Sequence, residues 1–425
     1  MGLQNIKVSA QQLLKLIPEN MFSKLATITK VDYCAKVLQG ERVFYLLLYG
    51  FLHSGKLSQR KLEQIFCSPS FKFLFNYSSD MKVGRSSISE RLSKINVDFF
   101  KQSYELLYKE LGKHYSEKEI FKMNLMRVDS TMVAETCNKL KKGFTVGKLA
   151  DKKGSRRHQI KYTMAYDGFA VKLAEVLDEK EYLSEDRAMP KVVEQLIKSD
   201  KHHSNLYIFD RGLSALSSFK SIDSQEARFV GRIRTNRKMQ FLRDLKTAET
   251  DIDLGKLELV EDKVVNLFNN ESNRFDDTEY RIVIARFKEE KDTTRPQNKG
   301  KVKKVENEIY FITNDFELSA KEIAEIYGKR WDIEVFFRFL KQELSFSHFL
   351  SVSDNGIKVI LYMTLITSML LMLYKKFNEL GYTMARFCFG LELEEWKIQL
   401  AILFCGGDVS KYGQIDYNRG IVKKL

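Results

Sequence analysis

The spacing of apolar residues changes near residue 123, and this change limits the possible folds more than any other feature of the chain. Before it, apolar side chains recur at helical intervals, as in residues 97–111. After it, short apolar runs are typical of strands, for example LMRVDSTMV (125–133) and NLYIFDRG (205–212). Three such strands, a helix, a strand, a second helix and a further strand follow in turn. We therefore predict a helical domain followed by a mixed α/β layered domain.

The same patterns predict where the domains divide. A charge-rich stretch with short strand-like runs interrupts the α/β domain, and we interpret it as a separate β-rich insertion. The strand EIYFITND and a long helix then resume the domain. The predicted parts are the helical domain (1–122), the first part of the α/β core (123–235), the insertion (236–305), the second part of the core (306–375), and a C-terminal helical tail that is a candidate for dimerisation (376–425).

Two short amphipathic helices are predicted inside the helical domain, over LSQRKLEQIF (57–66) and GRSSISERLSKI (84–95). The second contains Arg85 and Arg91, which are candidates for DNA contact. Together the two helices are compatible with a helix-turn-helix-like DNA reader. A plain helical bundle explains the same pattern, and both interpretations remain open.

The charge balance favours a polyanionic partner. The 425 residues carry 70 Lys and Arg against 56 Asp and Glu, a net charge of +14, which favours nucleic acid first and an anionic membrane surface second. The apolar run at 359–374 is shorter than the roughly 20 residues that a membrane span needs, so we predict a buried helix and no membrane partner. The N-terminal sequence has no signal-peptide pattern, and the 5 scattered cysteines form no CxxC pair. These features predict a cytoplasmic protein.

One predicted helix, YGKRWDIEVFFRFLKQEL (327–344), combines many aromatic residues with charges of both signs. At about 100° per residue, Tyr327, Arg330, Glu334 and Lys341 fall within an arc of about 60°, with Arg338 beside them. Apolar residues cover much of the remaining surface, so the helix is predicted to be packed with one narrow polar stripe. The stripe is compatible with a ladder of ion pairs spaced four residues apart, and equally with a functional site.

Two aspartates favour the functional interpretation. Asp129 lies within one predicted core strand and Asp210 near the end of another. An aspartate inside a core strand is unfavourable without a specific reason, such as a metal ion. Together with Glu334 they supply three hard oxygen donors, which match Mg²⁺ rather than Zn²⁺. Paired Mg²⁺ ions serve phosphoryl transfer, and Arg330 is then the best candidate for a bidentate contact to phosphate.

A strongly basic segment, residues 139–161, lies between the two aspartates and contains a single acidic residue, Asp151. A solvated charged loop is one interpretation. A contact to DNA phosphates is the other, and the nearby Asp129 favours it. The residues that we select as candidate DNA contacts are Lys152, Lys153, Arg156 and Arg157.

These motifs resemble those of a known family, the DDE transposases of bacterial insertion sequences, specifically the insertion-sequence-four family. Its helix signature Y-(2)-R-(3)-E-(6)-K is matched by Tyr327, Arg330, Glu334 and Lys341. VDST around Asp129 and FDRG around residue 210 look like its first and second aspartate motifs, and RFVGRIRTN looks like the strand that follows. The resemblance covers roughly residues 80 to 400.

The resemblance implies a ribonuclease-H-like mixed-sheet core with a β-rich insertion and an N-terminal all-helical domain that binds DNA ends. Asp129, Asp210 and Glu334 would hold the catalytic metals, two Mg²⁺ ions for which Mn²⁺ would substitute. Tyr327, Arg330 and the lysine of the signature would hold the phosphates at the element end. Family members bind the terminal inverted repeats of their own element, form a homodimer on paired ends, cut the strands, commonly through a hairpin, and join them to target DNA.

Some expectations remain open within this resemblance. Certain relatives stack a flipped base on a tryptophan in the insertion, where this chain offers Phe241, Phe268 or Phe275 instead. Asp186 is either a supporting polar group or, more simply, a helix N-cap. Besides an active transposase, the alternatives are a catalytically silent DNA-binding relative, a Mg²⁺-dependent nuclease for branched DNA, and a non-enzymatic regulator, which leaves the polar stripe unexplained.

Overall fold

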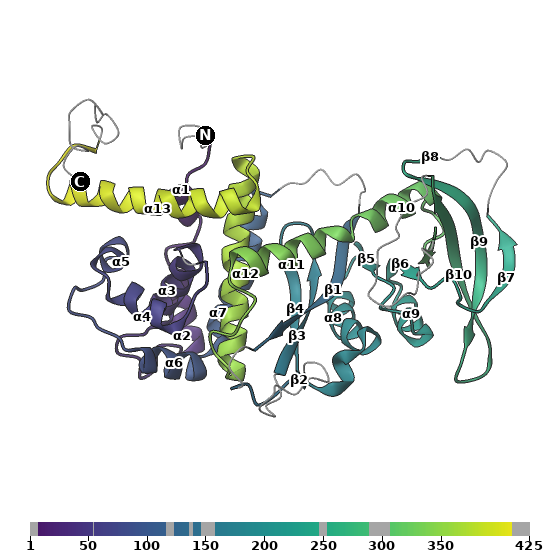
Figure 1. The fold of residues 1–425 in the computed structure, drawn as a ribbon, viewed down its shortest axis with the longest axis horizontal. Coiled ribbons are helices and arrows are strands. Elements are labelled where there is room, and N and C mark those ends of the chain that lie inside the picture. The colour runs from purple at the N-terminus through teal and green to yellow at the C-terminus, as the bar shows by residue number, and fades with distance from the viewer. Residues whose placement is uncertain are drawn as a thin grey trace, which may run out of the picture. The chain divides into compact units, whose positions relative to one another are not determined.

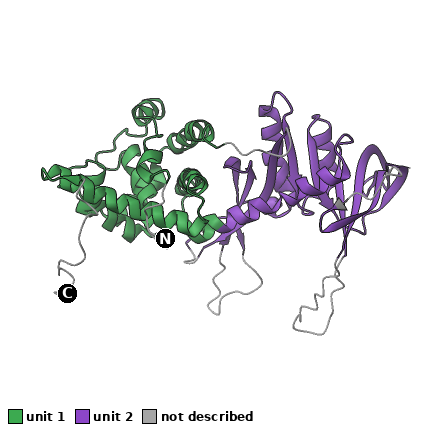
Figure 2. Ribbon diagram, turned by 90° about the horizontal axis from the view of Figure 1, so that it is seen from above, with its two compact units in different colours: residues 1–116, 339–425 green, residues 117–338 purple. Residues whose placement is uncertain are grey.

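The computed structural model describes residues 7–53, 55–115, 123–135, 139–145, 158–245, 253–288 and 307–409. The chain forms two compact units (Figure 2): residues 1–116 together with 339–425, and residues 117–338. The division therefore falls inside helix α11 (Trp331–Glu343). It differs from the predicted division, which assigned residues 306–375 to the core.

The first unit is helical, as the spacing of its apolar residues predicts. Its N-terminal helices and the two that follow α11 are α1 (Ala10–Leu14), α2 (Met21–Thr29), α3 (Gly40–His53), α4 (Gln59–Cys67), α5 (Pro69–Leu74), α6 (Arg85–Lys94), α7 (Val97–Gly112), α12 (Asp354–Phe377) and α13 (Tyr382–Phe404).

Helix α12 forms the centre of this unit and packs against α3, α6, α7 and α13. It has 24 residues, longer than the predicted apolar run, because its first turn is capped by the Ser353 side chain and its last turn carries lysines. By length and composition alone it is the one described helix able to cross a membrane. However, 89% of its apolar window is buried inside the structure, so burial rather than shortness marks it as a core helix.

Helices α4 and α6 contact each other, with α5 between them in sequence. This places the two predicted short helices side by side, within a larger helical bundle. The contact between α4 and α6 is compatible with a helix-turn-helix-like reader, and the contact of α6 with α12 makes the same helices part of a bundle, so both interpretations remain open.

The second unit is built on one sheet of 11 strands. Its elements are β1 (Asn124–Ala134), β2 (Phe144–Thr145), β3 (His158–Tyr166), β4 (Val171–Leu177), the 3-10 helix η2 (Lys180–Leu183), α8 (Glu185–Ser199), β5 (Asn205–Phe209), α9 (Leu216–Asp223), β6 (Arg228–Ile233), β7 (Met239–Asp244), β8 (Asp253–Leu254), β9 (Leu257–Asn269), β10 (Arg274–Phe287), β11 (Glu308–Thr313) and α10 (Ala320–Gly328).

The core of the sheet has the strand order β4-β3-β1-β5-β6 (Figure 1). The first three strands pair antiparallel, whereas β1, β5 and β6 pair parallel. Side chains alternate between the two faces of a strand. Met126, Val128 and Phe209 accordingly pack with α8 and α9 on one face, and Leu125 and Ile208 pack with α10 on the other.

The β-rich insertion is continuous with this sheet, contrary to the prediction of a separate piece. Strand β11 pairs with β6 on one side and with β10 on the other, both antiparallel. Strands β9 and β7 extend the sheet further. The buried pair of Arg281 and Asp262 joins β10 to β9, with 2.7 Å between Nη2 and Oδ2. The strands between residues 236 and 305 therefore share their hydrogen bonding with the core.

The long helix predicted after the strand EIYFITND, which includes residues 327–344, is two helices, α10 and α11. Around Gly328 the backbone tightens: the amide of Arg330 donates to Tyr327 at 3.0 Å and that of Asp332 to Lys329 at 3.1 Å. Arg127, which is buried on β1, donates to the Lys329 carbonyl at 3.3 Å and pairs with Asp332. This buried arginine holds the junction between the helices against the sheet.

Candidate active site

The two predicted aspartates lie at the point where the parallel pairing of β1 with β5 ends: Asp129 is in the middle of β1, and Asp210 directly follows β5. Val128 of β1 pairs with Phe209 of β5 in parallel register. Asp129 and Asp210 each follow one of these two residues, so both are at the same level of the sheet. Alternation along β1 places Asp129 on the face that packs against α10.

Burial and neighbouring negative charge perturb Asp129. The pKa of its carboxyl is raised to about 7, mainly by burial and also by the charges of Glu185 and Asp210, while the hydrogen bond from the Ser130 amide and the charge of Arg330 lower it. One Asp129 oxygen accepts the amide of Ser130 at 2.7 Å. A carboxyl in this environment favours either a proton or a nearby cation.

Asp210 accepts hydrogen bonds from two directions. The backbone amide of Arg211 lies 2.7 Å from its Oδ1, and the hydroxyl of Tyr327 lies 3.3 Å from the same oxygen. Burial, followed by the charge of Asp210, raises the pKa of Tyr327 to about 12. The tyrosine ring also packs on Phe311 of β11, with 5.1 Å between centroids. Tyr327 therefore reaches the aspartate from a ring that packing holds in place.

Glu334 is engaged by Arg330. The Arg330 Nη1 and Glu334 Oε1 are 2.6 Å apart, one helical turn from each other. The arginine also lies over the Tyr327 ring at 5.8 Å. Within the described ranges no ion pair joins Glu334 to Arg338, which is exposed. Only the first step of the alternative ion-pair ladder is therefore present.

Lys341, the last residue of the predicted signature, lies two turns beyond Glu334 on α11, past the division between the two units. It is half-buried, and burial lowers the pKa of its ammonium group. A desolvated cation favours an anionic partner.

The carboxylates of Asp129, Asp210 and Glu334 are suitable ligands for a hard divalent cation, but the three do not converge on one point where a metal ion could bind. No group of three acidic, histidine or cysteine side chains in the described part of the chain is arranged to hold a metal ion. The fit rests on the pair Asp129 and Asp210, whose mutual repulsion a cation would relieve. Glu334 would have to exchange its partner Arg330 for that position.

Two charged residues of the candidate site, Glu185 and Arg232, were not predicted from the sequence, and Lys161 was predicted only as part of the basic segment 139–161. Glu185, the first residue of α8, pairs with Lys161 of β3 at 2.8 Å. Arg232 of β6 carries a positive charge that lowers the pKa of Tyr327. The signals were a second acid in SEDRAM and a second arginine in RFVGRIRT, but neither motif shows which strand its side chain reaches.

Asp186 has a different role from the predicted N-cap. It lies inside the first turn of α8, whose N-cap is Ser184. Its carboxylate accepts the amides of Ser214 and Ala215, at 2.6 and 2.7 Å, just before α9. It therefore fixes the loop that follows Asp210.

The predicted DNA contacts outside this site have mixed outcomes. Lys152, Lys153, Arg156 and Arg157 lie outside the described residues. Arg85 begins α6 and is exposed.

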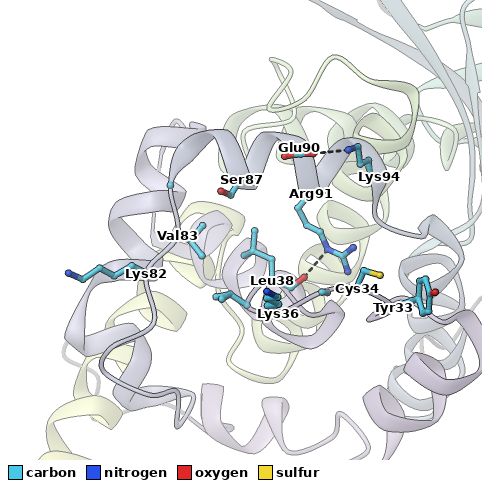
Figure 3. A pocket seen from close by; sticks show the side chains of 13 residues that line it. Tyr33, Cys34, Lys36, Leu38, Lys82, Val83, Ser87, Glu90, Arg91 and Lys94 are labelled. Atoms are coloured by element: carbon cyan, nitrogen blue, oxygen red, sulfur yellow. Dashed lines mark hydrogen bonds and ion pairs between the residues drawn. The ribbon is translucent and has the colours of Figure 1, made fainter.

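Arg91 lines a pocket of about 590 Å³ in the helical unit, together with Lys36, Lys82 and Lys94 (Figure 3). Its Nε and Nη2 donate to the carbonyls of Leu38 and Val31 at 2.8 and 2.6 Å. These two hydrogen bonds hold the loop between α2 and α3 against α6, which gives Arg91 a structural role.

The three phenylalanines that are candidates for stacking on a flipped base, Phe241, Phe268 and Phe275, all lie on strands of the insertion. Phe241 of β7 is 60% exposed. Phe275 packs edge-on against Phe268 across the β9–β10 pair, with 5.2 Å between centroids, and Lys238 lies over the Phe268 ring at 4.9 Å. The geometry does not distinguish among the three.

The core strand order, with helices on both faces and the two aspartates where the parallel pairing of β1 with β5 ends, defines a ribonuclease-H-like fold and confirms the predicted fold class. The chain belongs to the family described as Transposase DDE domain, whose model matches residues 121–370. The match confirms the resemblance drawn from the sequence motifs.

Individual relatives agree with this family. The chain is 28% identical over 183 residues to a protein of Sinorhizobium fredii named as transposase y4zB, covering 43% of this chain and 46% of that one. It is 26% identical over 204 residues to a Synechocystis protein named as a transposase for insertion sequence element IS4SA, covering 46% and 51%. The match thus spans about half the length of these relatives. A solved piggyBac transposase synaptic complex with hairpin DNA aligns over 95% of this chain and 82% of that one, with a TM-score of 0.45 and 10% identity.

Proposed function

We propose that this chain is an active DNA transposase, which binds the terminal inverted repeats of its own insertion sequence, cuts them with Mg²⁺ and joins the ends to target DNA. The observation that carries the proposal is the juxtaposition of Asp129 and Asp210 on neighbouring parallel strands, in a chain of the transposase family. Two carboxylates held this close, one with a pKa raised to about 7, suit a site that binds divalent cations.

The metal site proposed here consists of Asp129, Asp210 and Glu334. Two Mg²⁺ ions bound there, or Mn²⁺ in their place, would activate the attacking oxygen and stabilise the leaving one. To bind a metal ion, the Glu334 carboxylate would have to break its ion pair with Arg330. The guanidinium released by that exchange is then available for a phosphate, which it can bind bidentately. One rearrangement would thus supply both a metal ligand and a phosphate contact.

The remaining residues of the signature hold DNA in this proposal. Tyr327 keeps Asp210 oriented through its hydroxyl, while Lys341 and Arg338 meet the phosphates of the element end. Arg85 and the basic segment 139–161 contact DNA beyond the cut, in keeping with the net charge of +14. Pairing of two element ends would bring two copies of the chain together as a homodimer, in the bacterial cytoplasm.

The proposal is tested with a labelled duplex that carries the terminal repeat of the insertion sequence encoding this chain. Cleavage and joining are followed with Mg²⁺ for the wild type and for Asp129→Asn, Asp210→Asn and Glu334→Gln. Glu325→Gln is the matched control, because this glutamate is exposed on α10. We expect each of the three site variants to bind the duplex but to lose cleavage, and the control to cut normally.

Three results would contradict the proposal or one part of it. A wild type that binds the duplex without cutting it would be the catalytically silent relative, a possibility that the Arg330–Glu334 ion pair keeps open. A wild type that cuts branched DNA but never joins ends would be a nuclease. Normal cutting by Glu334→Gln would leave the ion pair as a purely structural contact.

A further inference from the structure

Glu185 lies against the strand that carries Asp129 and against the turn that contains Asp210. Its Oε2 accepts the hydroxyl of Ser130, the residue after Asp129, at 2.8 Å. On its other side it meets Gly212, two residues after Asp210. A Cβ added to Gly212 would lie 3.0 Å from the Glu185 Cγ, so the backbone of this turn approaches the Glu185 side chain closely. Glu185 therefore lies between Ser130 and the turn that follows β5.

A buried lysine fixes the other carboxylate oxygen. Lys161 Nζ lies 2.8 Å from Glu185 Oε1, and its side chain is only 1% exposed. The same ammonium group donates to the carbonyls of Tyr182 and Leu183 at 2.9 and 3.1 Å. All three ammonium donors are thus used, and the carboxylate is held by a cation that cannot move into water.

The approach comes from the face of the sheet opposite to the proposed metal ligands. Alternation along β1 places Ser130 on the α8 face and Asp129 on the α10 face. Glu185 therefore acts on Asp129 indirectly: it lies on the opposite face of the sheet and binds Ser130, the next residue of the strand. It also places a negative charge close enough to raise the pKa of Asp129.

We propose that Glu185 is a positioning residue, which with Lys161 holds the Asp129 strand and the Asp210 turn in the arrangement that binds divalent metal. This inference rests on the proposed function. Side chains that orient metal ligands in this way typically contribute about 10- to 100-fold to metal affinity or activity. Glu185→Gln keeps the size of the side chain and its hydrogen bond to Ser130 but removes the charge opposite Lys161.

The test measures metal binding directly. Full-length protein is titrated with Mn²⁺, and the free ion is followed by electron paramagnetic resonance. Cleavage of the terminal-repeat duplex is measured in parallel against Mg²⁺ concentration. The matched control is Glu194→Gln on the same helix, whose carboxylate accepts the hydroxyl of Ser221. We expect Glu185→Gln to weaken Mn²⁺ binding by about 10-fold or more, with unchanged DNA binding, and Glu194→Gln to match the wild type.

A second variant separates positioning from folding. Removing Glu185 alone leaves a buried lysine unpaired, which is destabilising, so Lys161→Met is combined with Glu185→Gln. We expect this double variant to regain the wild-type melting temperature while Mn²⁺ binding stays weak. Recovery of wild-type Mn²⁺ affinity would overturn the inference, because Glu185 would then serve only to neutralise Lys161. A wild type that neither binds Mn²⁺ nor cuts would reject the proposed function itself, whereas a cutting wild type matched by Glu185→Gln would reject only this inference.

Discussion

Arg330 Nη1 and Glu334 Oε1 face each other at 2.6 Å across one turn, and this contact occupies a carboxylate that the family signature assigns to metal. The same arginine lowers the pKa of Asp129. Arg330 therefore acts on two acidic residues of the proposed site, Glu334 and Asp129.

Replacing Arg330 should impair cutting more than binding. We expect Arg330→Ala to lower the single-turnover cleavage rate by about 10²-fold or more, in the range found when one preorganised charge donor is removed from an active site. Arg330→Lys should recover only part of the rate, because lysine cannot form a bidentate contact. Rates are measured on the labelled duplex, and binding by gel shift. A rate unchanged in Arg330→Ala would exclude a contact to the reacting phosphate.

Tyr327→Phe isolates a single hydroxyl. The ring would keep its packing on Phe311, but Asp210 would lose the hydrogen bond at 3.3 Å. We expect about a tenfold slower cleavage and a loss of folding stability of about 1 kcal/mol or less, as for one ordinary hydrogen bond. Stopped cleavage reactions and thermal melts measure the two effects. A large loss of stability without a change in rate would make the hydroxyl a structural group.

The stability of the metal-free protein should depend on pH through Asp129. Its pKa is raised from 3.8 to about 7 in the folded state, so the folded state favours the protonated form. The stabilisation is complete below about pH 4 and disappears as the pH rises through 7. Each pH unit in this window changes the free energy of unfolding by up to about 1.4 kcal/mol. Urea unfolding with EDTA from pH 4.5 to 8 should show this slope in the wild type, and Asp129→Asn should flatten it.

The ion pair within the extended sheet should matter for stability. Asp262 binds Arg281 through both oxygens, and both side chains are 7% exposed. Asp262→Ala would leave the arginine charge buried and unpaired, which costs about 3–5 kcal/mol. Urea unfolding monitored by circular dichroism measures the loss. Glu271→Ala, at the exposed tip of the β9–β10 hairpin, is the control and should change little.

The sequence was sufficient to predict the elements but not all of their relations. The strand and helix patterns predicted a mixed α/β core, and the family resemblance of the aspartate motifs and the helix signature implied its ribonuclease-H-like class. The break at Gly328 was missed, since the apolar spacing continues across it. The union of insertion and core was also missed, because β11 finds β6 about 75 residues earlier in the chain and strand pairing over such distances leaves no local pattern.

The acidic residues of the candidate site could also be predicted only in part, because contacts between distant segments leave no local sequence pattern. Asp129, Asp210 and Glu334 stand out because each lies in an apolar setting. Glu185 begins an amphipathic helix, where an acid is ordinary because it favours the helix dipole. Its contacts with Ser130 and Lys161 come from two strands distant in sequence, so only the folded chain shows them.

The union of insertion and core gives the protein room to vary. The β9–β10 hairpin lies beyond β11 in the strand order, so its tip can lengthen or change without altering the pairing of β1 with β5. Residues at the tip of the hairpin can therefore change while β1 and β5, which position Asp129 and Asp210, keep their register. Because β10 is hydrogen-bonded to β11, the base of the hairpin is fixed to the sheet, and a hairpin with a different tip would extend in the same direction.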